Sequence, residues 1–130
     1  MNLQTVETVK LDKIDVPITE RGDLVSLRQV VRGMAQQLHG TLRDQARVSW
    51  VANQLARQML DMSKGGDLSL EPLQESARTG IRVSCEGPWL RLVERTYRFH
   101  ISPMISRNDE VEYESGRSPR LMITMWMGAE

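Results

Sequence analysis

One stretch constrains this chain more than any other, and it runs from residue 48 to residue 62. Apolar residues recur there at helical steps, namely Val48, Ala52, Leu55, Met59 and Met62. That spacing places them in a single stripe along an α-helix. Lys64 and Gly65 follow. A positive charge is favourable at the C-terminal end of a helix, and a glycine adopts the left-handed backbone conformation of a helix cap at little cost. The sequence therefore predicts a central amphipathic helix with one buried face.

The residues before this helix predict a strand and a second helix. Apolar and polar residues alternate over 9–18, as in a strand with one buried face, and Pro17 favours a strand end or a sheet edge. Another helical stripe begins at Asp23, a favourable N-cap, and continues over residues 23–39, with Gly40 as its stop. Asp44 is expected to cap the central helix or to lie in its first turn.

Strand-like runs follow the central helix, with one helix-like segment among them. In order they are 68–73 (broken by Pro72), 81–85, the helix-like 89–101, 111–114 and 121–127. The last run is apolar on both faces, so it should be central in the sheet or covered by another chain.

This order of elements predicts an α+β fold. We expect a two-layer α/β sandwich, with helices on one face of a mixed or antiparallel sheet. Residues 1–130 should form a single domain, with 1–8 as a loose lead-in.

The composition is that of a globular protein and argues against several partners. With 130 residues, 40% of them hydrophobic, the chain can bury a core without metals or disulfides. The formal net charge is zero, so no overall field attracts nucleic acid or an anionic membrane. Cys85 is the single cysteine, and His39 and His100 lack the spacing of metal ligands. Without a signal-peptide pattern or a long apolar run, the expected location is cytoplasmic.

Several short motifs accompany this order of elements. They are Leu27-Arg28-Gln29, Asp44-Gln45-Ala46-Arg47, Gln54-Leu55-Ala56-Arg57-Gln58, Gly65-Gly66 and Cys85-Glu86-Gly87-Pro88. Over residues 16–127 the chain resembles the GHKL (Bergerat-fold) ATPase domain, in particular the small serine kinases and anti-sigma factors of bacterial partner-switching pathways. The resemblance implies a Bergerat-like fold, and in active members an ATP site with magnesium on the central helix. It also implies a role in transcription regulation, through a sigma factor, a STAS-domain antagonist or a homodimer.

The residues at the implied nucleotide site depart from the family pattern. Gln54 stands at the family's glutamate, and an amide cannot act as a general base. Gln58 stands at the magnesium-holding asparagine but is one methylene longer. Cys85 replaces the adenine-binding aspartate, and Trp89 replaces the second glycine after Gly87, where an indole can fill the ligand space itself.

The family's glycine-rich lid is also missing, because no glycine occurs over residues 97–109. Four losses at one ligand, counting Cys85 and Trp89 together as one altered turn, predict a pseudo-ATPase: a non-catalytic, regulatory, protein-binding domain with no catalytic residue, metal or cofactor. Two alternatives stay open. One is an active serine kinase or anti-sigma factor that binds ATP and magnesium despite the glutamines, and the other is a structural or assembly subunit that reuses the fold.

Candidate partner-binding residues lie late in the chain. Arg91, Arg95 and Arg98 would share one helix face, which is either a solvated surface or a contact for an acidic partner. Trp126 lies in the apolar last strand and is a further candidate.

Overall fold

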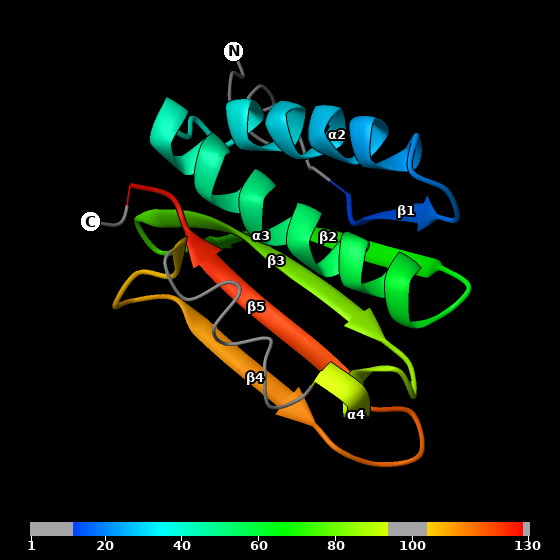
Figure 1. Ribbon diagram of the computed structural model, residues 1–130. Coiled ribbons are helices and arrows are strands. Elements are labelled where there is room, and N and C mark those ends of the chain that lie inside the picture. Colours follow the sequence, from blue (N-terminus) through cyan, green and yellow to red (C-terminus); the bar gives the residue numbers. More distant parts are fainter. Residues whose placement is uncertain (1–11, 94–103, 129–130) are drawn as a thin grey trace.

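The computed structural model describes residues 12–93 and 104–128, and within them an antiparallel five-stranded sheet carries helices on one face (Figure 1). The elements are β1 (Ile14–Ile18), α2 (Asp23–Gln37), α3 (Leu42–Met62), β2 (Gly66–Glu75), β3 (Arg78–Glu86), α4 (Leu90–Val93), β4 (Glu110–Glu114) and β5 (Arg120–Trp126). The strands are ordered β1-β2-β3-β5-β4. The predicted α+β class and order of elements are confirmed, and the sheet is antiparallel throughout.

The core lies between the sheet and the two long helices. In Figure 1, α3 crosses the sheet over β2 and β3, and α2 lies beside α3 near the β1 edge. The predicted stripe of α3 faces the sheet, because Val48, Ala52 and Leu55 are fully buried. Met62, predicted to continue the stripe, is the last residue of α3 and is 39% exposed.

The prediction that Asp23 caps α2 is wrong. Gly22 occupies the N-cap position and makes no side-chain cap hydrogen bond. The Asp23 carboxylate instead accepts hydrogen bonds from the backbone N–H groups of Thr19 and Glu20, at 2.8 and 3.0 Å, and from the Thr19 hydroxyl. These bonds hold the turn between β1 and α2 and lower the pKa of Asp23, chiefly through the two backbone donors.

The start of α3 follows one of the two expected arrangements. Thr41 is the N-cap, and Asp44 lies in the first turn. The Thr41 hydroxyl accepts from the Asp44 N–H, while the Asp44 carboxylate accepts from the Thr41 N–H, which forms a reciprocal capping box. At the other end, Gly65 has a φ of +102°, as a glycine at a helix end was expected to have.

Pro72 does not break β2, contrary to the sequence prediction. It lies opposite Ile81 of β3, and the pairing with β1 ends at Leu70. At Pro72 the strand therefore has a partner on one side only, where the missing backbone donor costs little. Pro17 lies in β1, an edge strand, as predicted.

The apolar last strand is central, which was the first of its two predicted explanations. β5 lies between β3 and β4, and alternate residues point into the core: Leu121, Ile123 and Met125 are fully buried. On the other face, Thr124 is 1% and Trp126 4% exposed.

The predicted strand residues 9–11 and most of the predicted helix over 89–101 lie outside the described residues. Of that helix, the structure describes α4, a single turn. No helix in the described parts of the chain is both long and apolar enough to span a membrane.

Candidate functional site

Gln54 and Gln58 lie one turn apart on a flank of α3, and both are half-buried. The Oε1 atom of Gln58 is buried and accepts no hydrogen bond within the described ranges. A buried acceptor without a donor destabilises the fold. Both side chains offer amide groups, and neither can take up a proton as a base.

Cys85 lies at the end of β3 and is 4% exposed. Burial raises the pKa of its thiol to about 12, because an apolar environment disfavours the thiolate. The group is therefore neutral at physiological pH and packs as a small hydrophobic side chain. It supplies no carboxylate acceptor for an adenine amino group.

Gly87 and Trp89 lie in direct contact just after β3. Gly87 has a φ of +155°, and a Cβ atom there would lie 2.7 Å from Cδ1 and 2.8 Å from Nε1 of Trp89. The indole is 6% exposed and belongs to the hydrophobic core. The close approach that requires a glycine at Gly87 is thus made by a side chain of the same chain.

These positions carry no acidic side chain. Within residues 12–93 and 104–128, no group of three or more His, Cys, Asp or Glu is arranged to hold a metal ion. Magnesium prefers carboxylate and water oxygens in near-octahedral geometry. Two amides, a neutral thiol and an indole do not fit such an ion.

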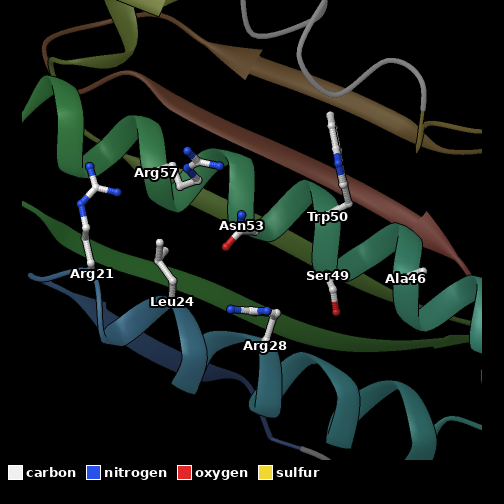
Figure 2. A pocket seen from close by; sticks show the side chains of 8 residues that line it. All are labelled: Arg21, Leu24, Arg28, Ala46, Ser49, Trp50, Asn53 and Arg57. Carbon is white, nitrogen blue, oxygen red and sulfur yellow. The ribbon is translucent and has the colours of Figure 1, made fainter.

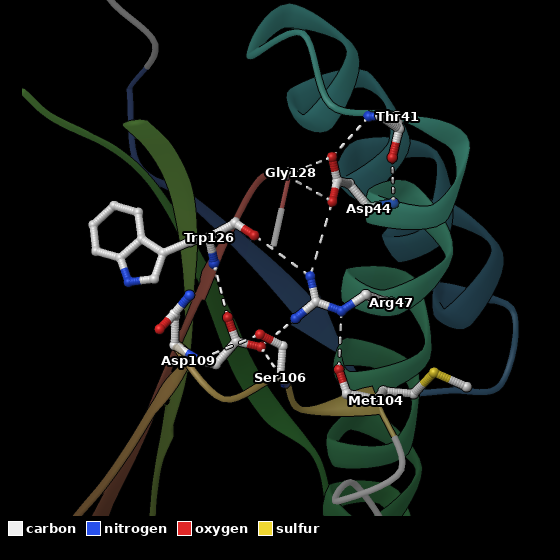
Figure 3. A network of polar contacts seen from close by, with 9 residues as sticks. Thr41, Asp44, Arg47, Met104, Ser106, Asp109, Trp126 and Gly128 are labelled. Atoms are coloured by element: carbon white, nitrogen blue, oxygen red, sulfur yellow. Dashed lines mark hydrogen bonds and ion pairs between the residues drawn. The ribbon is translucent and has the colours of Figure 1, made fainter. Parts of the chain in front are cut away.

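A buried polar network on the same flank of α3 was missed by the sequence reasoning (Figure 3). Its centre is Arg47, 4% exposed, which forms an ion pair with the fully buried side chain of Asp109. The Arg47 guanidinium also donates to the backbone oxygens of Met104, at 3.1 Å, and Trp126, at 3.4 Å. Asp109 accepts in addition from the N–H groups of Ser106 and Trp126.

Asp44 extends this network to the end of the sheet. Besides closing the capping box with Thr41, its carboxylate accepts from the Gly128 N–H at 3.0 Å and lies 3.9 Å from Arg47 Nη1. The network therefore joins the start of α3, the loop before β4 and the end of β5. A capping-box pattern was readable in the sequence, but Asp109 lies 62 residues from Arg47 and no local pattern connects them.

A groove of about 430 Å³ runs between α2 and α3 on the side away from the sheet (Figure 2). Three arginines, Arg21, Arg28 and Arg57, border it, and all are exposed. None of them forms an ion pair with another described residue. The groove is lined by Arg21, Leu24, Arg28, Ala46, Ser49, Trp50, Asn53 and Arg57. Sequence reasoning missed it, because the lining residues are spread over α2, α3 and the turn before α2.

Trp126 lies on the sheet face opposite the helices. Its ring covers Gly80, where a Cβ atom would lie 2.7 Å from Trp126 Cε3, and the Arg78 guanidinium carbon lies 3.7 Å from the ring centroid. The indole Nε1 is buried without a hydrogen-bond partner in the described structure. This packing accounts for the burial of Trp126 within the chain itself.

Arg91 holds a neighbouring turn. Its guanidinium donates to the backbone oxygens of Gly116 and Arg117 in the β4–β5 connection. Arg95 and Arg98, the other members of the predicted arginine face, lie outside the described residues. The structure therefore does not bring the three arginines together on a described surface, and their role as a partner contact stays a prediction.

Comparison with protein-family models and with curated proteins finds no match to this chain. The relationship to the GHKL ATPases stays a prediction from the motifs.

Proposed function

We propose that this chain is a non-catalytic regulatory domain that acts by binding other proteins. It keeps the framework of a GHKL (Bergerat-like) ATPase and has lost the nucleotide chemistry. The observation that carries the proposal is the contact between Gly87 and Trp89. The indole packs at the turn that would have to admit a nucleotide, with Trp89 only 6% exposed.

The chemistry of the other positions supports the same proposal. An active site of this class needs a carboxylate base and a magnesium ligand of fixed reach. Gln54 and Gln58 supply neither, and the neutral thiol of Cys85 cannot accept a hydrogen bond as a carboxylate does. A working nucleotide site would need different residues at several of these positions at once. This disfavours the alternative that the chain is an active serine kinase.

The proposed setting is the bacterial cytoplasm, within or derived from a partner-switching system. The proposed partner is a sigma factor or a STAS-domain antagonist, and this part of the proposal rests on the motif resemblance alone. No chemistry is assigned to the domain beyond binding.

Nucleotide titration tests the loss of ATP binding. We expect no saturable heat on titration with ATP and magnesium by calorimetry, and no rise in Tm at millimolar ATP. A ligand present at 100 times its Kd would stabilise the fold by about 2.7 kcal/mol, which a thermal melt readily detects. An active serine kinase of the same class, run in parallel, shows that the conditions permit binding. Saturable binding to this chain would overturn the pseudo-ATPase proposal.

Affinity capture from the native host tests the partner. A tagged chain should retain a sigma factor or a STAS-domain protein, identified by mass spectrometry, and the purified pair should re-form the complex. If purified candidates from the same genome do not bind, the partner-switching assignment is wrong. A structural or assembly subunit would then be the better description.

A further inference from the structure

The arginine groove presents positive charge that the described chain does not neutralise. No acidic side chain lines it, and Leu24, Ala46 and Trp50 add apolar surface between the polar groups. Arg21 lies in the turn before α2, Arg28 lies in α2 and Arg57 lies in α3, so the three guanidinium groups reach the groove from three segments of the chain. Three arginines around one groove suit a partner that presents several carboxylates.

The same chain carries such a row on β4. Glu110, Glu112 and Glu114 alternate along the strand, so they share one face, and all three are exposed. Val111 lies opposite Ile123, whose side chain is in the core, so Val111 is on the face that the helices cover. The glutamates alternate with Val111 and therefore point to the face away from the helices. None of them forms an ion pair with another described residue.

Within this acidic row, Glu110 and Glu112 face no charged residue on the neighbouring strand. Their cross-strand neighbours are Thr124 and Met122, which carry no charge, whereas Glu114 lies opposite Arg120. β4 is also an edge strand, so its outer side is free of a neighbouring strand in the described sheet. The row is accessible to another molecule.

We propose that the groove between α2 and α3 binds the acidic row on β4 of a second copy of this chain. Opposite charges favour the encounter and fix its orientation, and a net charge of zero leaves no overall repulsion between copies. Arginine suits the task, since its planar guanidinium pairs with carboxylates through two parallel hydrogen bonds. The proposal does not depend on the fate of the nucleotide site.

The contact is heterologous, because the two surfaces are different and lie on opposite sides of the molecule (Figure 1). One copy uses its helical face while the other uses the far edge of its sheet. Contacts of this kind build rings or open chains of copies, and they are not confined to dimers. Because the two surfaces differ, substitutions can disable the groove and the acidic row independently.

Charge reversal provides the test. The variant Arg28→Glu/Arg57→Glu reverses the groove, and Glu110→Arg/Glu112→Arg reverses the strand. All four positions are exposed, and circular dichroism and Tm confirm that each variant is folded. In sedimentation equilibrium at about 50 mM salt, the wild-type mass should rise with concentration, and it should return toward the monomer at about 0.5 M salt. Either reversal should weaken self-association by about tenfold or more.

Two further measurements decide the geometry. Mixing the two reversed variants should restore association, because the native groove of one pairs with the native row of the other and the two reversed surfaces also attract each other. Combining all four substitutions in one chain should restore self-association. A wild-type chain that stays monomeric at every concentration overturns the proposal. So does a dimer that neither reversal weakens, or binding of the groove only to an acidic protein other than this chain. No nucleotide or host partner enters the test, so its failure is distinct from failure of the proposed function.

Discussion

Two separate constraints favour glycine at position 87. Its φ of +155° lies in a region that L side chains rarely adopt, and the indole of Trp89 fills the space where a side chain would begin. Gly116 shares only the first constraint, since its φ is +142° and nothing lies within 4 Å of an added Cβ. Comparing the same substitution at the two glycines therefore distinguishes the cost of backbone strain from the cost of overpacking.

We expect Gly87→Ala to destabilise the fold more than Gly116→Ala. Backbone strain at either site should cost about 1–3 kcal/mol, and the collision with Trp89 should add about 1–3 kcal/mol at Gly87 alone. The free energy of unfolding in urea measures both losses. Equal losses in the two variants would show that Trp89 moves aside easily, which would also weaken the argument for a closed nucleotide site.

Helix α2 is anchored through the turn before it and has no side chain at its N-cap. The Asp23 carboxylate holds two backbone N–H groups of that turn, and these bonds favour its charged form. The pKa of Asp23 is therefore below its ordinary value of 3.8 in the folded protein. A carboxyl group with a lowered folded pKa stabilises the fold above its ordinary pKa, and this contribution disappears as the pH falls through the folded value.

The stability difference between the wild type and Asp23→Ala should accordingly depend on pH. We expect it to be constant from neutral pH down to about pH 5, to shrink below the ordinary value of 3.8, and to vanish once the folded carboxyl is protonated. Urea melts between pH 2 and pH 7 measure the difference. Asp23→Asn keeps an oxygen acceptor without a titrating group, so the pH dependence should be absent from its comparison with Asp23→Ala. A wild-type difference that grows toward low pH would contradict this account of the turn.

The network around Arg47 acts at the scale of elements, since it joins α3 to the loop before β4 and to β5. Its ion pair with Asp109 is buried, whereas the pair between Arg78 and Glu75 is 45% and 61% exposed. Removing one partner of a buried pair leaves an uncompensated charge away from water, and removing one partner of an exposed pair leaves a hydrated charge.

Arg47→Met should therefore cost about 3–5 kcal/mol of unfolding free energy, and the control Glu75→Gln should cost less than about 1 kcal/mol. Both variants remove one member of an arginine–carboxylate pair, and chemical denaturation compares them directly. Similar losses would mean that water reaches Asp109 and that the network does not anchor the loop.

At the scale of the whole molecule, the order of elements was readable because most elements carry a clear hydrophobic period, although the last strand is apolar on both faces. Alternation marked the strands, and the stripe of α3 marked the helix that covers them. The errors came from chemistry beyond the element: Asp23 bonds backward to the turn, and Pro72 is tolerated because β1 stops short of it. The ion pair of Arg47 with Asp109 and the arginine groove depend on residues distant in sequence, and no local pattern reveals them.

One hydrophobic core joins the two long helices to the sheet, so the chain should unfold in one step. The buried cluster includes residues of both long helices and of four strands, and Trp89 belongs to it. Far-UV circular dichroism and tryptophan fluorescence should give coincident transitions in urea. A helical signal that is lost before the fluorescence changes would show that α2 and α3 separate from the sheet as an independent unit.

The central place of β5 also bears on how the chain folds as it is made. Residues 120–126 leave the ribosome after every other described strand, yet they must enter the sheet between β3 and β4. Until then β3 has an open edge along residues 80–86, and β4 has no neighbour to pair with. Such an edge recruits strands of other chains. The nascent protein therefore passes through an interval of vulnerability to aggregation, which ends only when β5 completes the sheet.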